Sequence, residues 1–392
     1  MTDATSPLRV MDRAARDPES YVAEWKERTG GKAVAIFPMN FPVEIAHAAG
    51  ALPVIVQEDR EPLTLGNGLI SEFNCAYTRN LVDKVACGRL DVYDGVFMAD
   101  HCVQLVGAAD VVRELEPDRP LYFGQLISSM TDPWTRDRVG ITMKSFVTEL
   151  QALTGTAVDD ERLAGSVKAF NEGRRLLRNA LVARRDGDAS FTALELQILI
   201  KSSMVMDREE HNALLAAALA ERQPASRDDG RIRVHLSGHF CHAPKPELLT
   251  LIEEAGGQVV DDDLYHGARY VSTDVAEDVP PDDALAEWYL ARNVNIPCPT
   301  RAQSNVDWDA YLLKAIAASG AEAVISLMVK YCEPHMLYFP EVKKALEQAH
   351  IPHLLLETEH EGMPLEMMRT RIEAMFEQIR RTRVSPAGQG TA

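Results

Sequence analysis

Three of the six cysteines in this chain of 392 residues occupy similar places. Cys75 opens an expected helix, Cys102 follows the expected strand 95–100 by two residues, and Cys332 comes after an expected strand, AVISLMV. Thiolates are the ligands of soft metals and of iron–sulfur clusters. In an open parallel sheet, ligands collect beyond the carboxyl ends of the strands, where helix N-termini also point. These three thiols could therefore converge on one metal site.

Simple packing is the alternative for each thiol, because free cysteine is among the most often buried residues. The other three are less well placed: Cys87 lies in the last turn of a helix, Cys241 follows a strand within GHFCHAP, and Cys298 lies between two prolines. Cys298 is the main rival as a ligand. His239 and His242 flank Cys241 in the manner of zinc ligands, but no further ligand pattern follows. The absence of a CxxC motif disfavours zinc ribbons, thioredoxin motifs and ferredoxin-type clusters.

Candidate proton donors are Glu44 and His47, which lie one helical turn apart at the start of an expected helix, and His101, which adjoins Cys102. Each could reach a pocket at the thiols and donate a proton there. A structural or outer hydrogen bond is the alternative role for a histidine in such a place.

Two blocks of alternating strands and helices must position these residues. Apolar strand-like runs alternate with helical patterns over 32–126 and again over 233–359, which favours parallel sheets. Between the blocks, 3.6-residue apolar spacing predicts a helical insert. The sequence therefore predicts an α/β protein, with two parallel-sheet α/β domains and a helical insert between them. The expected divisions are an N-terminal helical arm (1–30), a first α/β domain (31–131), the insert and a linker (132–227), a second α/β domain (228–385) and a disordered tail (386–392).

Composition excludes several classes of function. A net charge of −18 and a pI near 5.1 would repel nucleic acid. No apolar run is long enough to span a membrane, and the first residues carry no secretory signal, so we expect a cytoplasmic protein. The segment RTGGKAVAIF has glycines and a lysine but lacks the spacing of a phosphate-binding loop, so we expect no ATP site in this chain.

Several segments together resemble a known family. They are EFNCAYTRN, DGVFMADHC, VKYCEPHMLYFPEVKKALEQAHIPHLLLETEHEG and MRTRIEAMFEQI. They are similar to the 2-hydroxyacyl-CoA dehydratase component D and class I benzoyl-CoA reductase subunits, and the resemblance runs from about residue 30 to 381. The segments FPMNFPVEI and GHFCHAPKPELL most closely resemble the smaller of the two cluster-bearing benzoyl-CoA reductase subunits, the C subunits.

The resemblance implies a cofactor and partners. In that family three cysteines of a subunit hold a [4Fe-4S] cluster. The cysteines of this chain that match them are Cys75, Cys102 and Cys332. It implies a homologous cluster-bearing subunit, ATPase activator subunits, reduced ferredoxin as the electron source, and an acyl-CoA thioester substrate. The ATP is then expected on the partner subunits and not on this chain. The cluster is expected in the cleft between the two α/β domains.

The activity that the resemblance implies is ATP-dependent reduction of benzoyl-CoA, in which low-potential electrons pass to the aromatic ring and give a cyclohexadiene-carboxyl-CoA. One alternative is a subunit of a 2-hydroxyacyl-CoA dehydratase. Another is an electron-relay or scaffold subunit beside a homologue that binds the substrate.

Overall fold

The computed structural model describes residues 6–37, 41–224, 230–238 and 240–384. The segment FPMNFP is described only in part, and His239 and the expected tail 386–392 lie outside the described residues. The expected N-terminal arm contains two helices, α1 (Pro7–Arg16) and α2 (Pro18–Thr29).

The first sheet has four parallel strands in the order β2-β1-β3-β4. Its three longer strands are almost entirely buried, as their unbroken apolar sequences predict for a parallel sheet covered on both faces. The strands and the helices between them are β1 (Lys32–Phe37), α3 (Val43–Ala48), β2 (Ala51–Ile55), η1 (Gly66–Gly68), α4 (Ala76–Ala86), β3 (Gly95–Ala99), α5 (Val103–Leu115) and β4 (Leu121–Gly124).

Four helices follow the first sheet, where the sequence predicts a helical insert. They are α6 (Thr135–Thr154), α7 (Asp160–Asp186), α8 (Ala193–Ser203) and α9 (Arg208–Ala220). Helix α8 begins with a capping box, in which Thr192 and Glu195 each bond the other's backbone N–H. Helix α7 packs against α3 and α9, so the insert covers one side of the first sheet.

The second sheet repeats the strand order of the first, as β6-β5-β7-β8, and all of its pairings are parallel. Its helix α12 packs back on α6 and α7. The elements are β5 (Ile232–Gly238), α10 (Pro246–Glu254), β6 (Gly257–Asp262), α11 (Ala268–Val271), α12 (Pro281–Asn295), α13 (Trp308–Ser319), β7 (Ala323–Val329), α14 (Glu333–Gln348), β8 (His353–Thr358) and α15 (Leu365–Val384).

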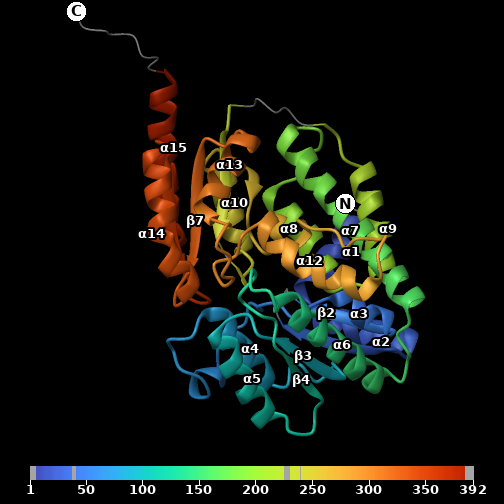
Figure 1. Ribbon diagram of the computed structural model, residues 1–392. Helices are drawn as coiled ribbons and strands as arrows, with labels where there is room; N and C mark the ends of the chain where they lie inside the picture. The colour runs from blue at the N-terminus through green and yellow to red at the C-terminus, as the bar shows by residue number, and fades with distance from the viewer. Residues whose placement is uncertain (1–5, 38–40, 225–229, 239, 385–392) are drawn as a thin grey trace, which may run out of the picture.

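The predicted fold class is confirmed: two parallel sheets, each surrounded by helices, form a two-domain α/β fold. Figure 1 shows the first sheet in the lower half of the molecule and the second in the upper half. The division of the chain at residues 131 and 228 stays a prediction.

The carboxyl ends of the two sheets face each other. Arg79, at the start of α4, donates to Glu359 after β8 over 2.6 Å. Glu58, after β2, accepts from His242, after β5, over 2.6 Å. The loops that follow strands of both sheets therefore meet in one layer, which is where ligands of open parallel sheets bind.

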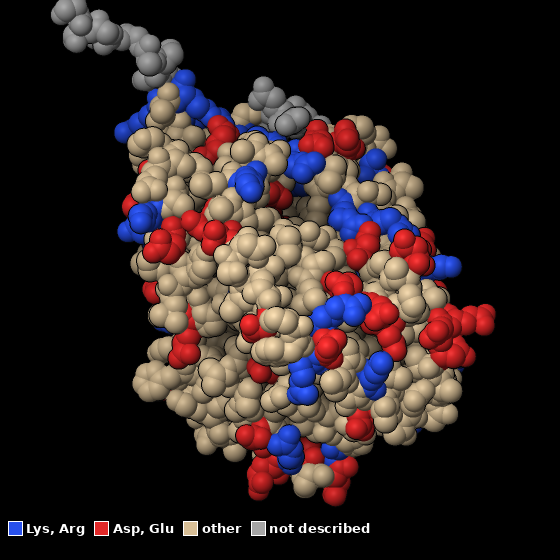
Figure 2. Space-filling model, in the orientation of Figure 1, with Lys and Arg blue, Asp and Glu red and all other residues tan. Residues whose placement is uncertain are grey.

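The surface agrees with the composition. On the face that Figure 2 shows, the acidic and basic side chains of the described residues are interspersed and form no continuous basic band. Among the described residues, the helices are too short or too polar to cross a membrane.

A buried histidine in the second sheet predicts how stability depends on pH. His235 in β5 is fully buried, and its Nδ1 lies 3.2 Å from Asp261. Burial alone would lower the pKa of His235, but the hydrogen bonds and charges of Asp261 and Asp263 raise it to about 10. A raised folded-state pKa contributes stability that is complete below the unfolded value of about 6.5 and is lost as the pH rises through about 10.

We therefore expect the free energy of unfolding of the wild-type chain to exceed that of His235→Gln by less and less as the pH rises from 6.5 to 10. Urea unfolding of both proteins at pH 6.5, 8 and 9.5 measures this. A constant difference in the free energy of unfolding over that range would contradict a charged histidine in the sheet.

Candidate functional site

All three candidate cluster cysteines stand at the starts of helices. Cys75 is the N-cap of α4, Cys102 of α5 and Cys332 of α14. Backbone N–H groups in the first turns of these helices, at Thr78, Leu105 and His335, act to lower the pKa values of the three thiols. Because the first turn of a helix presents unpaired N–H groups and the positive end of its dipole, each of these positions favours a negatively charged sulfur.

One glutamine side chain connects the three loops that carry these cysteines. Gln104 lies two residues after Cys102. Its Oε1 accepts the backbone N–H of Cys75 over 2.8 Å, and its Nε2 donates to the backbone carbonyl of Tyr331 over 2.8 Å. Tyr331 directly precedes Cys332. A single amide therefore holds together chain segments from both sheets at the point where the thiols emerge.

The loop before Cys332 has an unusual backbone. Tyr331 has a φ of 62°, in the left-handed region that side chains other than glycine seldom adopt. The ring of Phe73 meets its ring edge to face at 5.7 Å, and Gln104 binds its carbonyl. Phe73 and Gln104, which belong to the part of the chain around the first sheet, thus hold the strained turn at Tyr331, directly before α14 begins.

The thiols are close enough to influence one another's charge. Burial raises the pKa of Cys102 to about 11, and the nearby Cys75 adds to the rise. Burial, Cys75 and Cys102 also raise the pKa of Cys332. Cys241 belongs to the same group, since burial and the charges of Cys102, Cys75, Cys332 and Cys298 all raise its pKa. The structure therefore brings together the three predicted thiols and two others.

The remaining cysteines differ in their surroundings. Cys298 is buried, its N–H is accepted by Asn293 over 2.8 Å, and its sulfur lies 3.0 Å from the hydroxyl of Thr300. Its nearness to Cys332 and Cys241 keeps it as the rival ligand. Cys87 is exposed at the far end of α4, where it contacts Thr64.

A buried acid–histidine pair lies against the first thiol. The Nδ1 of His242 bonds Glu58 over 2.6 Å, its Nε2 lies 3.3 Å from the backbone nitrogen of Tyr77, and the same side chain acts on the sulfur of Cys75. Burial alone would lower the pKa of His242, but Glu58 and Cys75 raise it to about 10. Burial alone would raise the pKa of Cys75, yet His242 and Thr78 lower it. This imidazolium therefore favours the thiolate form of Cys75. The second oxygen of Glu58 binds His360.

Sequence reasoning missed Gln104, Glu58 and His360, and it weighed His242 only as a zinc ligand. Glu58, His242 and His360 each follow a strand, and Gln104 lies in the first turn of a helix after one. The rule that selected the cysteines, placement beyond carboxyl strand ends, also applies to these residues. Their polar types, common in any loop, gave no further signal.

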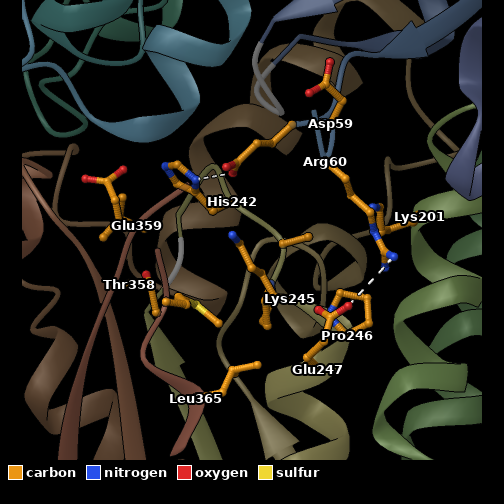
Figure 3. Close-up of a pocket in the computed structure, with 15 residues that line it drawn as sticks. Asp59, Arg60, Lys201, His242, Lys245, Pro246, Glu247, Thr358, Glu359 and Leu365 are labelled. Atoms are coloured by element: carbon orange, nitrogen blue, oxygen red, sulfur yellow. Dashed lines mark hydrogen bonds and ion pairs between the residues drawn. The ribbon is translucent and has the colours of Figure 1, made fainter. Parts of the chain in front are cut away.

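A cavity of about 330 Å³ opens beside this pair. Figure 3 shows His242 at one wall, Lys201 and Arg60 at the opposite side, and Lys245 between them. The lining comes from the ends of strands in both sheets, from α8 and from the starts of α10 and α15: Glu58, Asp59, Arg60, Lys201, His242, Ala243, Pro244, Lys245, Pro246, Glu247, Val329, Thr358, Glu359, Met363 and Leu365. Polar and apolar side chains both line this space, which adjoins the Cys75 loop through His242.

Two of the three predicted proton donors make contacts with the helical insert. The carboxylate of Glu44 is fully buried and pairs with Arg174 of α7. His47 lies 3.0 Å from the hydroxyl of Ser166 and 3.3 Å from Glu209 of α9. These contacts connect α3 to the insert, and a role in proton donation stays a prediction for both residues.

The third predicted donor, His101, is buried next to Cys102. The guanidinium of Arg301 lies 3.5 Å from its Nδ1. Burial, with the positive charges of Arg301, Arg269 and Arg292, lowers the pKa of His101 well below its usual value. The imidazole is therefore neutral at pH 7, and its role as a donor also stays a prediction.

The ion pair of Glu44 gives a test of its role. Glu44→Gln would leave Arg174 buried without its carboxylate, and we expect the free energy of unfolding to fall by about 3–5 kcal/mol. Urea unfolding measures the loss, and the iron content per folded chain should not change. Unchanged stability together with lost turnover would instead support proton donation by Glu44.

The donor set fits an iron–sulfur cluster in its chemistry. Three thiols stand at the starts of three helices around one glutamine, and burial and the charges of Cys75 and Cys102 raise the pKa of Cys332, an effect that a bound cation opposes. Among the residues that the structure describes, no three His, Cys, Asp or Glu side chains form a group arranged to hold a metal ion. Since the thiolates of a [4Fe-4S] cluster bind different irons, they need not converge on one point, and the cluster stays a proposal.

Comparison with known proteins adds to this geometry. The family described as 2-hydroxyglutaryl-CoA dehydratase, D-component, matches residues 38–379. The chain belongs to this family. The match includes all three cysteine-capped helices and most of both sheets.

Members of the D-component family with different reactions are similar to this chain. The (R)-phenyllactyl-CoA dehydratase beta subunit of Clostridium sporogenes is 24% identical, covering 93% of this chain and 96% of its own. The C subunit of benzoyl-CoA reductase from Thauera aromatica is 26% identical, covering 84% and 86%. The beta subunit of (R)-2-hydroxyglutaryl-CoA dehydratase from Acidaminococcus fermentans is 24% identical, covering 95% and 98%. These relatives support a subunit of an enzyme complex that acts on CoA thioesters.

Proposed function

We propose that this chain is the iron–sulfur subunit of an ATP-dependent benzoyl-CoA reductase. The observation that carries the proposal is the bridge made by Gln104, which ties the loops of Cys75 and Cys332 to the helix that follows Cys102. The similarity to the C subunit of a benzoyl-CoA reductase supports the substrate class.

In this proposal Cys75, Cys102 and Cys332 hold a [4Fe-4S] cluster, with no fourth ligand assigned in this chain. When bound, such a cluster supplies single electrons at low potential. The amides at the starts of α4, α5 and α14 stabilise negative charge on the sulfurs. His242, held by Glu58, lies beside the sulfur of Cys75 and lowers the pKa of that thiol, which favours its thiolate.

Partners complete the proposed reaction. Reduction of an aromatic ring lies at or beyond the low end of iron–sulfur potentials, which reach about −700 mV, so the electrons need an energy input. We propose that ATPase activator subunits hydrolyse the ATP and that reduced ferredoxin supplies the electrons. A homologous cluster-bearing subunit would work beside this chain.

A 2-hydroxyacyl-CoA dehydratase subunit is the second candidate, because the phenyllactyl-CoA and hydroxyglutaryl-CoA relatives are named as dehydratases. The two reactions differ in their net redox change. The purified complex, given ATP and a low-potential reductant, should consume benzoyl-CoA with stoichiometric oxidation of the reductant. Loss of water from a 2-hydroxyacyl-CoA with only catalytic reductant would favour the dehydratase.

An electron-relay role is separated from catalysis by a structure of the complex with substrate. The proposal expects the acyl-CoA carbonyl next to the iron held by this chain. A substrate bound only at the homologous subunit, with the iron of this chain closed to ligands, would assign the relay role instead.

A further inference from the structure

A second and smaller cavity, of about 30 Å³, lies beside α12. Three of its lining residues are arginines and none is acidic. The residues are Met130, Arg269, Tyr289, Arg292, Asn293, Ile296, Cys298 and Arg301. A space of this size holds one or two water molecules or one small ion.

Two of these arginines are deeply buried. The exposed fraction of Arg269 is 4% and that of Arg292 is 7%. Arg292 stacks on the ring of Trp288 at 4.5 Å, and burial lowers the pKa of its guanidinium to about 10. Like charges gathered in a buried space are costly, so the lining of this cavity favours the entry of a negative group.

Arg269 retains an unused donor. Its Nη1 donates to the backbone carbonyls of Ile296 and Pro297, whereas its Nη2 has no hydrogen-bond partner among the described residues. Asp263 acts on Arg269 electrostatically. The oxygens of that carboxylate, however, already accept from Ser237, Gly238 and Trp308. No ion pair joins Arg269 to a carboxylate within the described part of the chain.

Arg301 connects the cavity to the candidate cluster site. Its guanidinium donates to the backbone carbonyls of Asp100 and His101 over 3.2 and 3.3 Å, directly before Cys102. Its charged group lies over the ring of Tyr289 at 5.8 Å. Its Nη1 also donates to the carbonyl of Thr300, and its Nη2 lies 3.5 Å from Nδ1 of His101. Within the described part of the chain, no ion pair joins Arg301 to a carboxylate.

We propose that this cavity binds a small monovalent anion, either a free ion such as chloride or a carboxylate group, through Arg269, Arg292 and Arg301. The two ligands share one chemistry: a compact negative charge that accepts hydrogen bonds from guanidinium N–H groups. The anion site adjoins the candidate cluster site, but anion binding does not depend on the proposed electron transfer, so either proposal can fail without the other.

The test uses the purified full-length chain and two probes, sodium bromide and sodium formate, at constant ionic strength. We expect a saturable rise in the unfolding temperature with probe concentration, as binding to the folded state requires. Crystals soaked in bromide should show an anomalous peak among the three arginines. A response to formate alone would identify the ligand as a carboxylate, and a response to both probes as a free anion.

Arg292→Gln and Arg301→Gln should each lower the affinity for the probes at least about tenfold, since each removes one of three cations. The affinity is read from the probe concentration that gives half of the full rise in unfolding temperature. Lys201→Gln is the matched control, because it removes a cation from the larger cavity and should leave the response unchanged. A response to neither probe, or equal responses in the wild type and both arginine variants, would overturn the proposal.

Discussion

The Cys332→Ser substitution is expected to strip most of the iron from the chain after anaerobic purification. Of the three proposed ligands, Cys332 alone follows a strand of the second sheet. Its loss would therefore leave the cluster bound only to residues that follow the first sheet. Serine is nearly isosteric, but its hydroxyl is a poor ligand for iron in such clusters. Iron and acid-labile sulfide per folded chain, with electron paramagnetic resonance of the reduced protein, measure the effect.

Two cysteine variants serve as controls for this result. Cys87→Ser changes an exposed thiol on α4 and should keep the full iron content. Cys298→Ser tests the rival ligand and should also keep it. An empty site in Cys298→Ser, together with normal iron in Cys332→Ser, would show that the proposed ligand set is wrong.

The Gln104→Glu substitution is expected to lower the affinity for the cluster by about 10–100-fold, the usual cost of losing an outer partner of a metal site. A carboxylate at this position can still accept the N–H of Cys75, but it cannot donate to the carbonyl of Tyr331 and would repel it. The strained turn before Cys332 would then lose its bond to the first sheet. Iron retained during titration with a chelator measures the affinity.

A buried glutamine elsewhere provides the matched control for Gln104. Gln197 of α8 donates to the carbonyl of Pro244 over 2.8 Å, outside the loops that carry the three proposed ligands. Gln197→Glu should lower stability in a similar way but leave the iron affinity unchanged. In the iron-free Gln104→Glu chain, a thiol reagent should also react faster with Cys75. Equal iron loss in both variants would show that Gln104 acts only on folding.

The general architecture could be predicted because it is encoded locally. Runs such as KAVAIF and AVISLMV are apolar at nearly every position, and strands of a parallel sheet covered on both faces bury such runs completely. The junctions between strands and helices follow from the same pattern, so Cys75, Cys102 and Cys332 could be expected at the starts of helices.

The contacts that define the site could not be predicted, because they join distant parts of the chain. Gln104 and Tyr331 are separated by 227 residues, and Glu58 and His242 by 184. No periodic pattern specifies which side chains meet when two sheets face each other. Glu44 shows the same limit: its helical spacing with His47 was visible, but its partner Arg174 belongs to the insert, whose packing on α3 the sequence does not state.

The central claim is that one cluster joins the three sulfurs at 75, 102 and 332. X-ray diffraction from anaerobically grown crystals of the iron-loaded chain, measured at the iron absorption edge, tests it directly. The account predicts a single anomalous peak in contact with these three sulfurs, between the starts of α4, α5 and α14. Iron bound instead at Cys241 and Cys298, or three thiols with no iron between them, would contradict it.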